Sequence, residues 1–316
     1  MKAAVVTSFG AAPEFGTFPE PVAADGETVV TVAAAPLSPI VRALAAGTHY
    51  ASGTTAGFVP GVDGIGTDPD GRRVYFLFPK SPFGSMAQKS LVSSGMLVPV
   101  PEELADDRAA AIATAGLASW VALTRRARLA RGETVLVTGA NGAAGRMALQ
   151  VARHLGASRT IAVARNDAKL EELDADVKIP LHDDAAGALR AAFDEGVDVV
   201  LDFVWGEPAI RVLQAAAGNR GSGAGEPRLR YVQLGTAAGG EIPVRGDLLR
   251  SSGLELMGSG IGSVAISDLL AGAGELLASA PAAGFTPPFE GVPLARISEA
   301  WSSGSGVRYI IQPNAA

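Results

Sequence analysis

The stretch ETVLVTGANGAAGRMALQVARHLGA, residues 133–157, decides the fold. Its apolar run at 134–138 predicts a buried strand, and the periodic apolar residues at 145–155 predict a helix. The glycines between them allow a sharp turn, a close approach of the backbone to a pyrophosphate and tight packing of helix on strand. A helix N-terminus also offers free N–H groups to phosphates. The stretch therefore predicts the phosphate-binding turn of a dinucleotide-binding domain.

The glycine pattern departs from the strict G-x-G-x-x-G fingerprint, because Ala140 occupies the place of its first glycine. A tight strand-to-helix turn without a ligand is the alternative interpretation. The strand before the turn, the helix after it and the alternation beyond favour a binding function. We expect six residues of the turn to bind the cofactor: Gly139, Asn141, Gly142, Ala143, Ala144 and Gly145.

The sequence pattern changes near residue 117, which divides the chain into two parts. Residues 1–116 carry short strand-like runs broken by glycine and proline, which predicts a β-rich, barrel-like domain. From 117 onward, strand-like and helical runs alternate, which predicts a doubly wound parallel sheet. The fold class is therefore α/β. By its spacing, the stretch from about 284 is either a tail on the parallel domain or a return to the first domain.

The end of the second strand of the parallel domain predicts the cofactor. NAD-binding sheets carry an acidic residue there for the ribose hydroxyls, whereas a nearby arginine accommodates a 2′-phosphate. Arg165 follows the run 160–164 and Lys169 comes one helical turn later. Asp167 is more naturally a helix cap. We expect Arg165 and Lys169 to bind NADPH, the alternative being ordinary surface cations.

Composition excludes several functions. The net charge of −6 argues against nucleic acid as a partner, and we find no apolar run long enough for a membrane span. The sequence contains 0 cysteines, which excludes disulfides and cysteine-ligated zinc. The first residues, MKAAVVTSFG, look like an opening strand rather than a secretory signal, so we expect a cytoplasmic protein.

Several further segments carry a resemblance to a known family. They are PGVDGIGT (60–67), LVPVPEELADDRAAAIATAGLASWVAL (97–123), LGTAAGG (234–240) and LRSSGLELMGSG (249–260). Together with the glycine turn, they resemble the medium-chain dehydrogenase/reductase superfamily, and the second resembles its zinc-free quinone oxidoreductases in particular. The likeness runs over nearly the whole chain, with its most specific motifs in the middle third.

The resemblance implies the fold in detail. A GroES-like substrate domain is expected at 1–116 plus 285–316, and a Rossmann-type NADPH-binding domain at 117–284. The active site is expected in a cleft between the domains, with Thr114 and Gly235 also binding the cofactor. Members commonly form homodimers by pairing edge strands, for which 254–257 is the matching segment.

The resemblance also places the positions at which zinc-dependent members bind metal. They fall at Ser38, Val62 and Thr114, and Asp63 is the one carboxylate left beside them. One carboxylate is not a zinc site. We therefore expect hydride transfer without a metal to an acceptor that is already electrophilic, a quinone or a similar apolar enone.

Three residues are candidates for the chemistry. Ser38 matches an asparagine of the quinone oxidoreductases, and Tyr50 is the nearest equivalent of a tyrosine that related enoyl reductases are thought to use as proton donor. His49 is an additional titratable group. The alternative interpretation of His49 is a histidine on a surface loop, and that of Tyr50 is an aromatic side chain that only packs. Two rival functions stay open: an enoyl or enone reductase of a biosynthetic pathway, and a cofactor-binding protein with little turnover.

Overall fold

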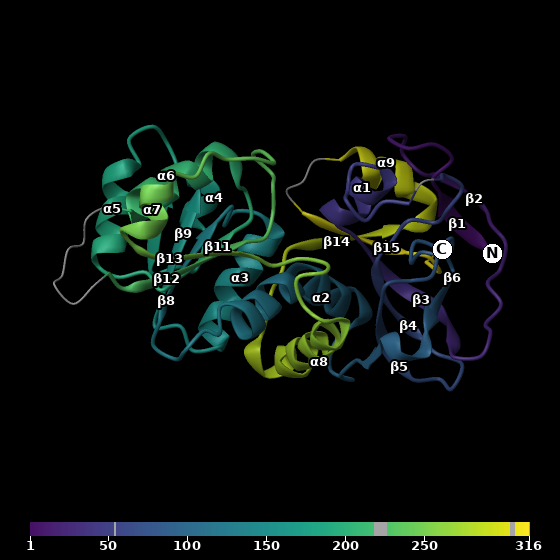
Figure 1. Ribbon diagram of the computed structural model, residues 1–316. Helices are drawn as coiled ribbons and strands as arrows, with labels where there is room; N and C mark the ends of the chain where they lie inside the picture. The colour runs from purple at the N-terminus through teal and green to yellow at the C-terminus, as the bar shows by residue number, and fades with distance from the viewer. Residues whose placement is uncertain (54, 218–225, 304–306, 316) are drawn as a thin grey trace. The chain divides into compact units, whose positions relative to one another are not determined.

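The computed structural model describes residues 1–53, 55–217, 226–303 and 307–315, which form two compact units (Figure 1). Unit 1 comprises Met1–Ala115 and Leu270–Ala316, and unit 2 comprises Gly116–Leu269. The domain limits expected from the sequence, at 116/117 and 284/285, remain a prediction about where each domain ends. No described helix is both long and apolar enough to cross a bilayer.

Unit 2 is built on a parallel sheet with the strand order β10-β9-β8-β11-β12-β13. Its strands are β8 (Thr134–Thr138), β9 (Arg159–Ala164), β10 (Val177–Pro180), β11 (Val199–Asp202), β12 (Arg228–Gln233) and β13 (Gly253–Gly258). The order reverses between β8 and β11, which pair in parallel. Ligands of such sheets bind at the carboxyl ends of the strands beside this reversal. The expected Rossmann-type sheet is confirmed.

Helices cover both faces of this sheet because its central strands are apolar on both sides. Leu136 and Val200 pack with Phe193 and Val212 against α5 (Ala186–Asp194) and α6 (Gly206–Ala216). The intervening Val135 and Val137 are also fully buried. Helix α3 (Ala143–His154) contacts β8 and β9. The remaining helices of unit 2 include α4 (Asp167–Glu171) and α7 (Gly246–Arg250) (Figure 1).

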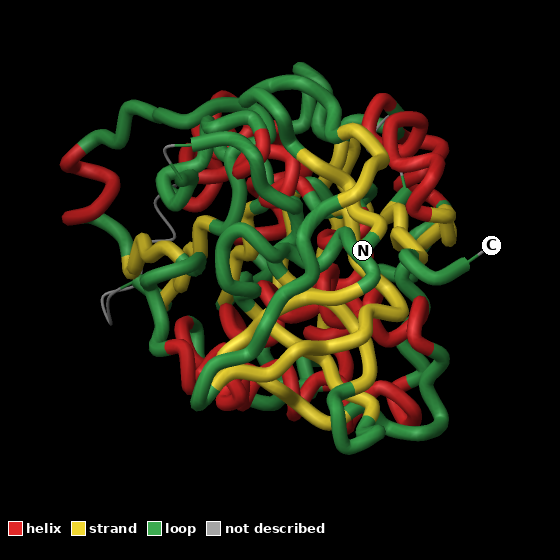
Figure 2. Tube along the Cα trace, turned by 90° about the vertical axis from the view of Figure 1, so that its right-hand side faces the viewer, coloured by secondary structure: helices red, strands yellow, loops and turns green. Residues whose placement is uncertain are grey.

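Unit 1 is β-rich, as expected for the GroES-like part. Its larger sheet has the order β14-β15-β3-β4-β5-β7, β6 also pairs with β3, and β1 pairs with β2. Figure 2 shows the strands of the chain in yellow and its loops in green. The strands are β1 (Lys2–Val5), β2 (Glu14–Thr17), β3 (Glu27–Leu37), β4 (Asp63–Thr67), β5 (Arg73–Leu77), β6 (Lys89–Ser93), β7 (Leu97–Pro99), β14 (Phe289–Pro293) and β15 (Arg308–Gln312).

The C-terminal stretch folds back onto the first part of the chain. Strand β15 pairs antiparallel with β3, with Tyr309 opposite Leu37. Of the two alternatives left by the spacing, the structure therefore adopts the return rather than the tail. The helices that accompany unit 1 are α1 (Pro39–Ala45), α2 (Asp106–Val121), α8 (Ile266–Ala283) and α9 (Ile297–Ser302), of which α2 and α8 begin or end in unit 2.

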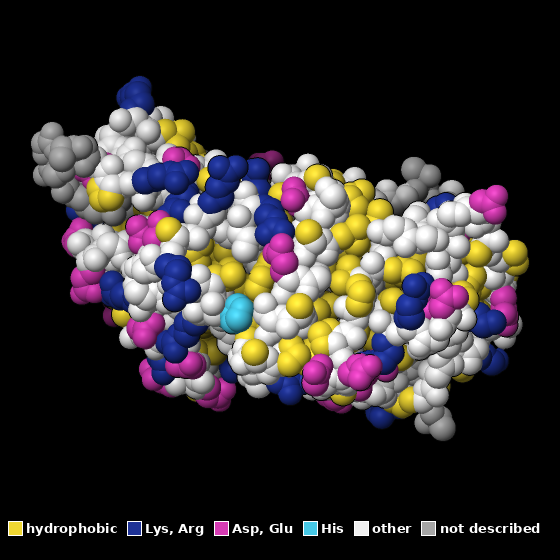
Figure 3. Space-filling model, turned by 90° about the horizontal axis from the view of Figure 1, so that it is seen from below, with side chains coloured by type: hydrophobic (Ala, Val, Ile, Leu, Met, Phe, Trp, Pro, Cys, Tyr) yellow, Lys and Arg dark blue, Asp and Glu magenta, His cyan; other side chains and the backbone are white. Residues whose placement is uncertain are grey.

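Surface charge is mixed in sign. On the face in Figure 3, basic and acidic side chains are interspersed. Ion pairs account for part of this mixing, for example Arg153 with Asp174 and Arg125 with Asp268.

Candidate cofactor and active site

The glycine turn forms as the sequence predicts. Gly139 has φ +65°, a left-handed conformation that favours glycine, and its carbonyl accepts a hydrogen bond from the Gly142 N–H at 3.0 Å. Gly142 is extended and is the N-cap of α3, and its carbonyl accepts the first helical bond, from Arg146 N at 2.9 Å. The free N–H groups of the first turn of α3 therefore begin directly at the turn.

Gly145 lies where only a hydrogen atom fits. A Cβ at this position would be 2.4 Å from the carbonyl oxygen of Gly139 and 2.7 Å from the Cα of Ala140. The first turn of α3 consequently packs directly on the backbone that leaves β8. This close packing keeps the N-terminus of α3 next to the end of the strand.

Asn141 connects the turn to the next strand. Its Nδ2 donates to the carbonyl of Asn166 at 2.8 Å, just past the end of β9. Its Oδ1 is buried and has no hydrogen-bond partner among the described residues. A buried acceptor without a donor is costly unless a ligand or water supplies one. The turn thus fits a group that carries donors, such as the ribose of a dinucleotide.

The segment after β9 corrects one expectation. Asp167 does not cap α4: the N-cap is Asn166, whose Oδ1 accepts from Lys169 N at 3.0 Å. Asn166 has the extended backbone that an N-cap requires, whereas Asp167 is already the first helical residue. The Asp167 carboxylate instead contacts His182 Nε2 at 2.8 Å. Arg165 and Lys169 are exposed, and neither forms an ion pair with another described residue.

A buried carboxyl group organises the carboxyl ends of β8, β11 and β12. The side chain of Asp202 is fully buried and accepts bonds from the hydroxyls of Thr138 and Tyr231 and from the N–H groups of Val204 and Trp205. Burial, and then the nearby Asp202, raise the pKa of Tyr231 far above its ordinary value. The sequence reasoning missed this residue, because its partners are far apart in the chain.

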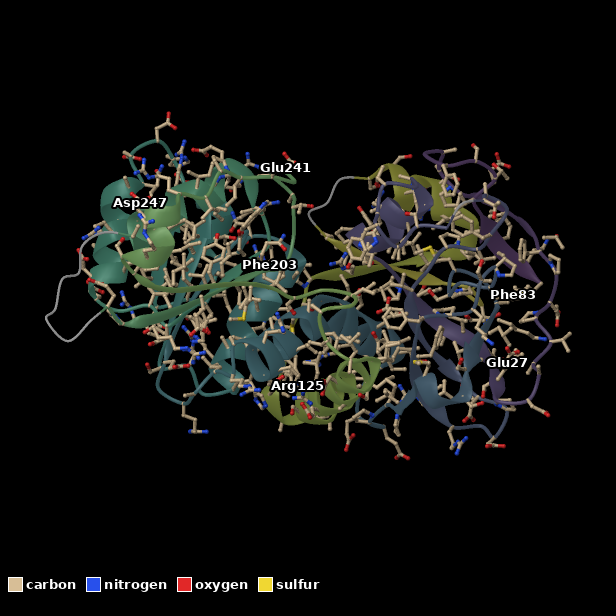
Figure 4. All side chains as sticks on the ribbon, viewed as in Figure 1. Glu27, Phe83, Arg125, Phe203, Glu241 and Asp247 are labelled. Atoms are coloured by element: carbon tan, nitrogen blue, oxygen red, sulfur yellow. The ribbon has the colours of Figure 1, made fainter. Side chains whose placement is uncertain are left out.

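The loop after β11 has an unusual backbone. Trp205 has φ +54° and ψ −156°, a conformation that a bulky residue rarely adopts. Asp202 holds it there through the Trp205 N–H, and the Trp205 ring lies edge-on to Tyr231 at 6.4 Å between centroids. The loop begins with Phe203, labelled in Figure 4, and the N–H of Gly235 bonds to the Asp202 carbonyl at 3.1 Å. Gly235 therefore lies beside this loop at the edge where ligands bind.

The three catalytic candidates lie in unit 1 around α1. Ser38 precedes the helix, is buried, and its Oγ has no hydrogen-bond partner among the described residues. His49 and Tyr50 follow the helix, with their rings 4.1 Å apart between centroids. Tyr50 is 75% exposed, and partial burial lowers the pKa of His49. Thr114 is half-buried on α2.

A second buried carboxyl group lies in unit 1. Asp63 begins β4, is 3% exposed, and accepts from the Tyr75 hydroxyl at 3.0 Å. Burial raises its pKa to about 7, although the Tyr75 bond and the charge of Arg308 act in the opposite direction. Arg308 is itself buried, which lowers its pKa, and its Nη1 donates to the Leu37 carbonyl at 3.4 Å.

Comparisons with known proteins decide the family. A family model described as "Zinc-binding dehydrogenase" matches residues 143–278. A relative from Emericella nidulans, described as a probable NADPH-dependent quinone reductase, is 31% identical over 99% of this chain and 100% of its own length. This chain belongs to the quinone oxidoreductase-like medium-chain dehydrogenases/reductases.

Two further likenesses extend this result. The structure of a quinone oxidoreductase from Thermus thermophilus, described also in complex with NADPH, matches with a TM-score of 0.81 and 30% identity over 99% of this chain and 100% of that one. A phenolphthiocerol/phthiocerol polyketide synthase protein of Mycobacterium tuberculosis is 32% identical over 62% of this chain, which corresponds to 9% of the synthase protein.

Because the chain belongs to this family, the residues at the positions matched to zinc ligands can be described. Among the described residues, no cluster of three or more His, Asp or Glu side chains is arranged to hold a metal ion. At the positions that the sequence resemblance matches to the metal ligands of zinc-dependent members, the structure has a buried hydroxyl at Ser38 and half-buried side chains at Val62 and Thr114. Asp63 beside them is engaged with Tyr75.

The Asp63 carboxyl predicts a pH dependence of stability. Its pKa is about 7 in the folded chain against an ordinary 3.8, so the folded state holds a proton that the unfolded state releases first. The free energy of unfolding of the wild type should therefore fall relative to Asp63→Asn as pH rises from about 4 to about 7, by up to about 4 kcal/mol. Urea unfolding of both proteins at each pH measures this difference. A difference that stays constant over this window contradicts the assignment.

Proposed function

We propose that this chain is an NADPH-dependent oxidoreductase that reduces a quinone or a similar apolar conjugated carbonyl without zinc. The observation that carries the proposal is the cation pair Arg165 and Lys169 beside the glycine turn. These side chains have no ion-pair partner among the described residues, while Asp167, which lies between them in the sequence, is engaged by His182. A 2′-phosphate would supply the missing anion. The NADPH-dependent relative and the NADPH complex of the Thermus enzyme support this assignment.

The residues present fit the cofactor. NADPH, when bound, supplies the hydride that reduces the acceptor. The free N–H groups at the start of α3 would bind its pyrophosphate, and the close packing of Gly145 would keep them at the strand end. The loop that Asp202 fixes would position the nicotinamide half at the carboxyl ends of β8 and β11.

On the substrate side, Ser38 and Tyr50 are the candidates to hydrogen-bond the acceptor's oxygen. Ser38 contributes a buried hydroxyl without a partner among the described residues. Tyr50 contributes an exposed phenol on the loop after α1. Because a quinone is already electron-poor, its reduction requires mainly positioning and a proton. His49 remains a candidate source of that proton.

Arg165→Ala combined with Lys169→Ala is expected to raise the Kd for NADPH about 10- to 100-fold and to change that for NADH little. Both lost contacts are charge-assisted bonds to the 2′-phosphate, which NADH lacks. Cofactor oxidation followed at 340 nm with a panel of quinones and enones, together with a fluorescence titration of each cofactor, measures this effect.

Arg159→Ala is the matched control, because Arg159 lies at the opposite end of β9 and pairs with Glu195. It removes one positive charge away from the glycine turn and should leave the preference for NADPH intact. A wild type that uses NADH as well as NADPH would contradict the proposed cofactor. Tight NADPH binding without turnover on any acceptor would instead favour a cofactor-binding protein.

A second function has specific support. The match to part of a polyketide synthase favours an enoyl or enone reductase of a biosynthetic pathway. In that case Tyr50 would be the proton donor. Enoyl thioesters in the same acceptor panel distinguish the two functions, since turnover faster than with quinones would favour the second.

We also propose a cytoplasmic homodimer. Strand β13 forms the edge of the parallel sheet, pairs only with β12 among the described strands, and exposes Leu256. An open strand edge is a ready site for pairing with a second copy. We further retain the expected domains, 1–116 with 285–316 and 117–284, as part of this proposal.

A further inference from the structure

We propose that His182 is a specificity-determining positioning residue, which engages Asp167 and thereby makes the adenosine end of the site select a 2′-phosphate over a 2′-hydroxyl. The inference rests on the proposed binding of NADPH and concerns how NADH is rejected. It starts from the contact between His182 Nε2 and Asp167 Oδ1, at 2.8 Å.

Asp167 is the carboxylate that would otherwise favour NADH. It is the first residue of α4 and the nearest acidic residue after the end of β9. In dinucleotide-binding sheets, an acidic residue about 20 positions after the glycine turn accepts the ribose 2′-hydroxyl. A free carboxylate at Asp167 would therefore attract the ribose of NADH and repel the phosphate of NADPH.

The backbone of His182 is fixed from two elements. Just before it, Leu181 N bonds to the Ala164 carbonyl at 2.8 Å, which continues the pairing of β10 with β9. The carbonyl of His182 accepts from Ala185 N at 3.1 Å and from Arg211 Nη1 at 2.9 Å. The ring consequently starts from a defined point at the end of β10 and spans to the start of α4.

The surrounding charges are consistent with a phosphate site. Arg165 and Lys169 belong to the same segment as Asp167 and are exposed. On the His182 side, Arg211 is engaged by Glu207 and Asp183. The cations beside Asp167 are therefore available to a phosphate, and the hydrogen bond from His182 occupies the Asp167 carboxylate that lies between them in the sequence.

The pair is suited to selectivity rather than to stability. The His182 and Asp167 side chains are 48% and 59% exposed. Pairs that exposed contribute little to the free energy of unfolding, because water and salt screen them. Removing His182 should therefore change which cofactor binds while leaving the fold in place, which separates this role from a structural one.

The test uses four variants of the full chain: His182→Ala, His182→Gln, Asp167→Ala and the double variant His182→Ala/Asp167→Ala. Calorimetric titration with 2′,5′-ADP and 5′-AMP, then with NADPH and NADH, gives each preference as a ratio of Kd values. His182→Ala should lower the preference for the 2′-phosphate about three- to ten-fold, the range for the loss of one hydrogen bond to a carboxylate. His182→Gln, which can still donate to Asp167, should retain most of it.

The double variant is the decisive measurement. If His182 acts through Asp167, removing both should restore the wild-type preference, whereas a general loss of structure would not be reversed by a second truncation. Asp174→Ala is the control for removing an exposed carboxylate elsewhere in unit 2, where Asp174 pairs with Arg153, and it should leave the ratio unchanged.

The outcomes separate the two proposals. A wild type that binds 5′-AMP as tightly as 2′,5′-ADP overturns the proposed cofactor and this inference with it. A wild type that prefers 2′,5′-ADP while His182→Ala keeps the same ratio overturns this inference alone. A double variant that remains as impaired as His182→Ala also overturns it, because the effect would then not pass through Asp167.

Discussion

Gly145→Val is expected to eliminate measurable NADPH binding and to destabilise unit 2 by several kcal/mol. Even the Cβ of this side chain would overlap the Gly139 carbonyl oxygen, at 2.4 Å, and the Ala140 Cα, at 2.7 Å. Both atoms belong to backbone, so they cannot move aside as a flexible side chain could. The start of α3 must shift away from β8, which disperses the N–H groups that we assign to the pyrophosphate. Fluorescence titration with NADPH and urea unfolding measure the two effects.

Gly142→Ala is the matched control at the same turn. Its backbone φ is −75°, and a Cβ there would lie 3.4 Å from the Gly139 carbonyl oxygen, at the edge of ordinary contact. We expect this variant to unfold at nearly the wild-type urea concentration. A large loss of NADPH affinity with an intact fold would show that the cofactor itself approaches this residue. Normal NADPH binding by Gly145→Val would refute the role of the turn.

Asp202→Ala is expected to lower the free energy of unfolding of unit 2 by about 4 kcal/mol or more, because each buried donor left without an acceptor costs about 1–3 kcal/mol. Four donors lose their acceptor: the hydroxyls of Thr138 and Tyr231 and the N–H groups of Val204 and Trp205. Trp205 would then be free to leave its positive φ, and the loop at the end of β11 would lose its shape. We expect NADPH affinity to fall with it.

Asp198→Ala makes the same change near the amino end of β11. The Asp198 carboxylate accepts from Thr134 N at 2.8 Å and is less buried than that of Asp202. It should cost about 1 kcal/mol and leave NADPH affinity unchanged. Equal losses of unfolding free energy and of NADPH affinity in the two variants would contradict the role assigned to the Asp202 network. The comparison is made by measuring the urea unfolding of unit 2 in each variant.

The strands of the parallel sheet could be predicted where local pattern and tertiary environment agree. The run at 134–138 has three apolar residues between two threonines, which also favour strands, and it forms β8 with the same limits. Strand β10 was not predicted, because a lysine and a proline occupy two of its four positions and only its pairing with β9 makes it a strand. Helix α5 was missed for a related reason: Ala185 gives it no side-chain cap, so its start carries no signal.

The candidate site divides in the same way. The glycine turn could be predicted, because it depends on the backbone geometry of a few neighbouring residues. The Asp202 network has no such signal, because Tyr231 is 29 and Thr138 is 64 positions away from it. The cap of α4 was assigned one residue too late, to Asp167, since Asn and Asp are equally good caps and only the backbone conformation distinguishes them.

The pairing of β15 with β3 has a consequence for synthesis on the ribosome. Arg308 and Leu37, which meet where these strands pair, are 271 positions apart, and all of unit 2 is translated between them. At a synthesis rate of about 5–20 residues per second, many seconds pass between the synthesis of β3 and that of β15, and unit 2 can fold in that time. A chain truncated before β15 would therefore present the backbone of Ala35–Leu37 as an open edge, and open edges invite pairing with other nascent chains.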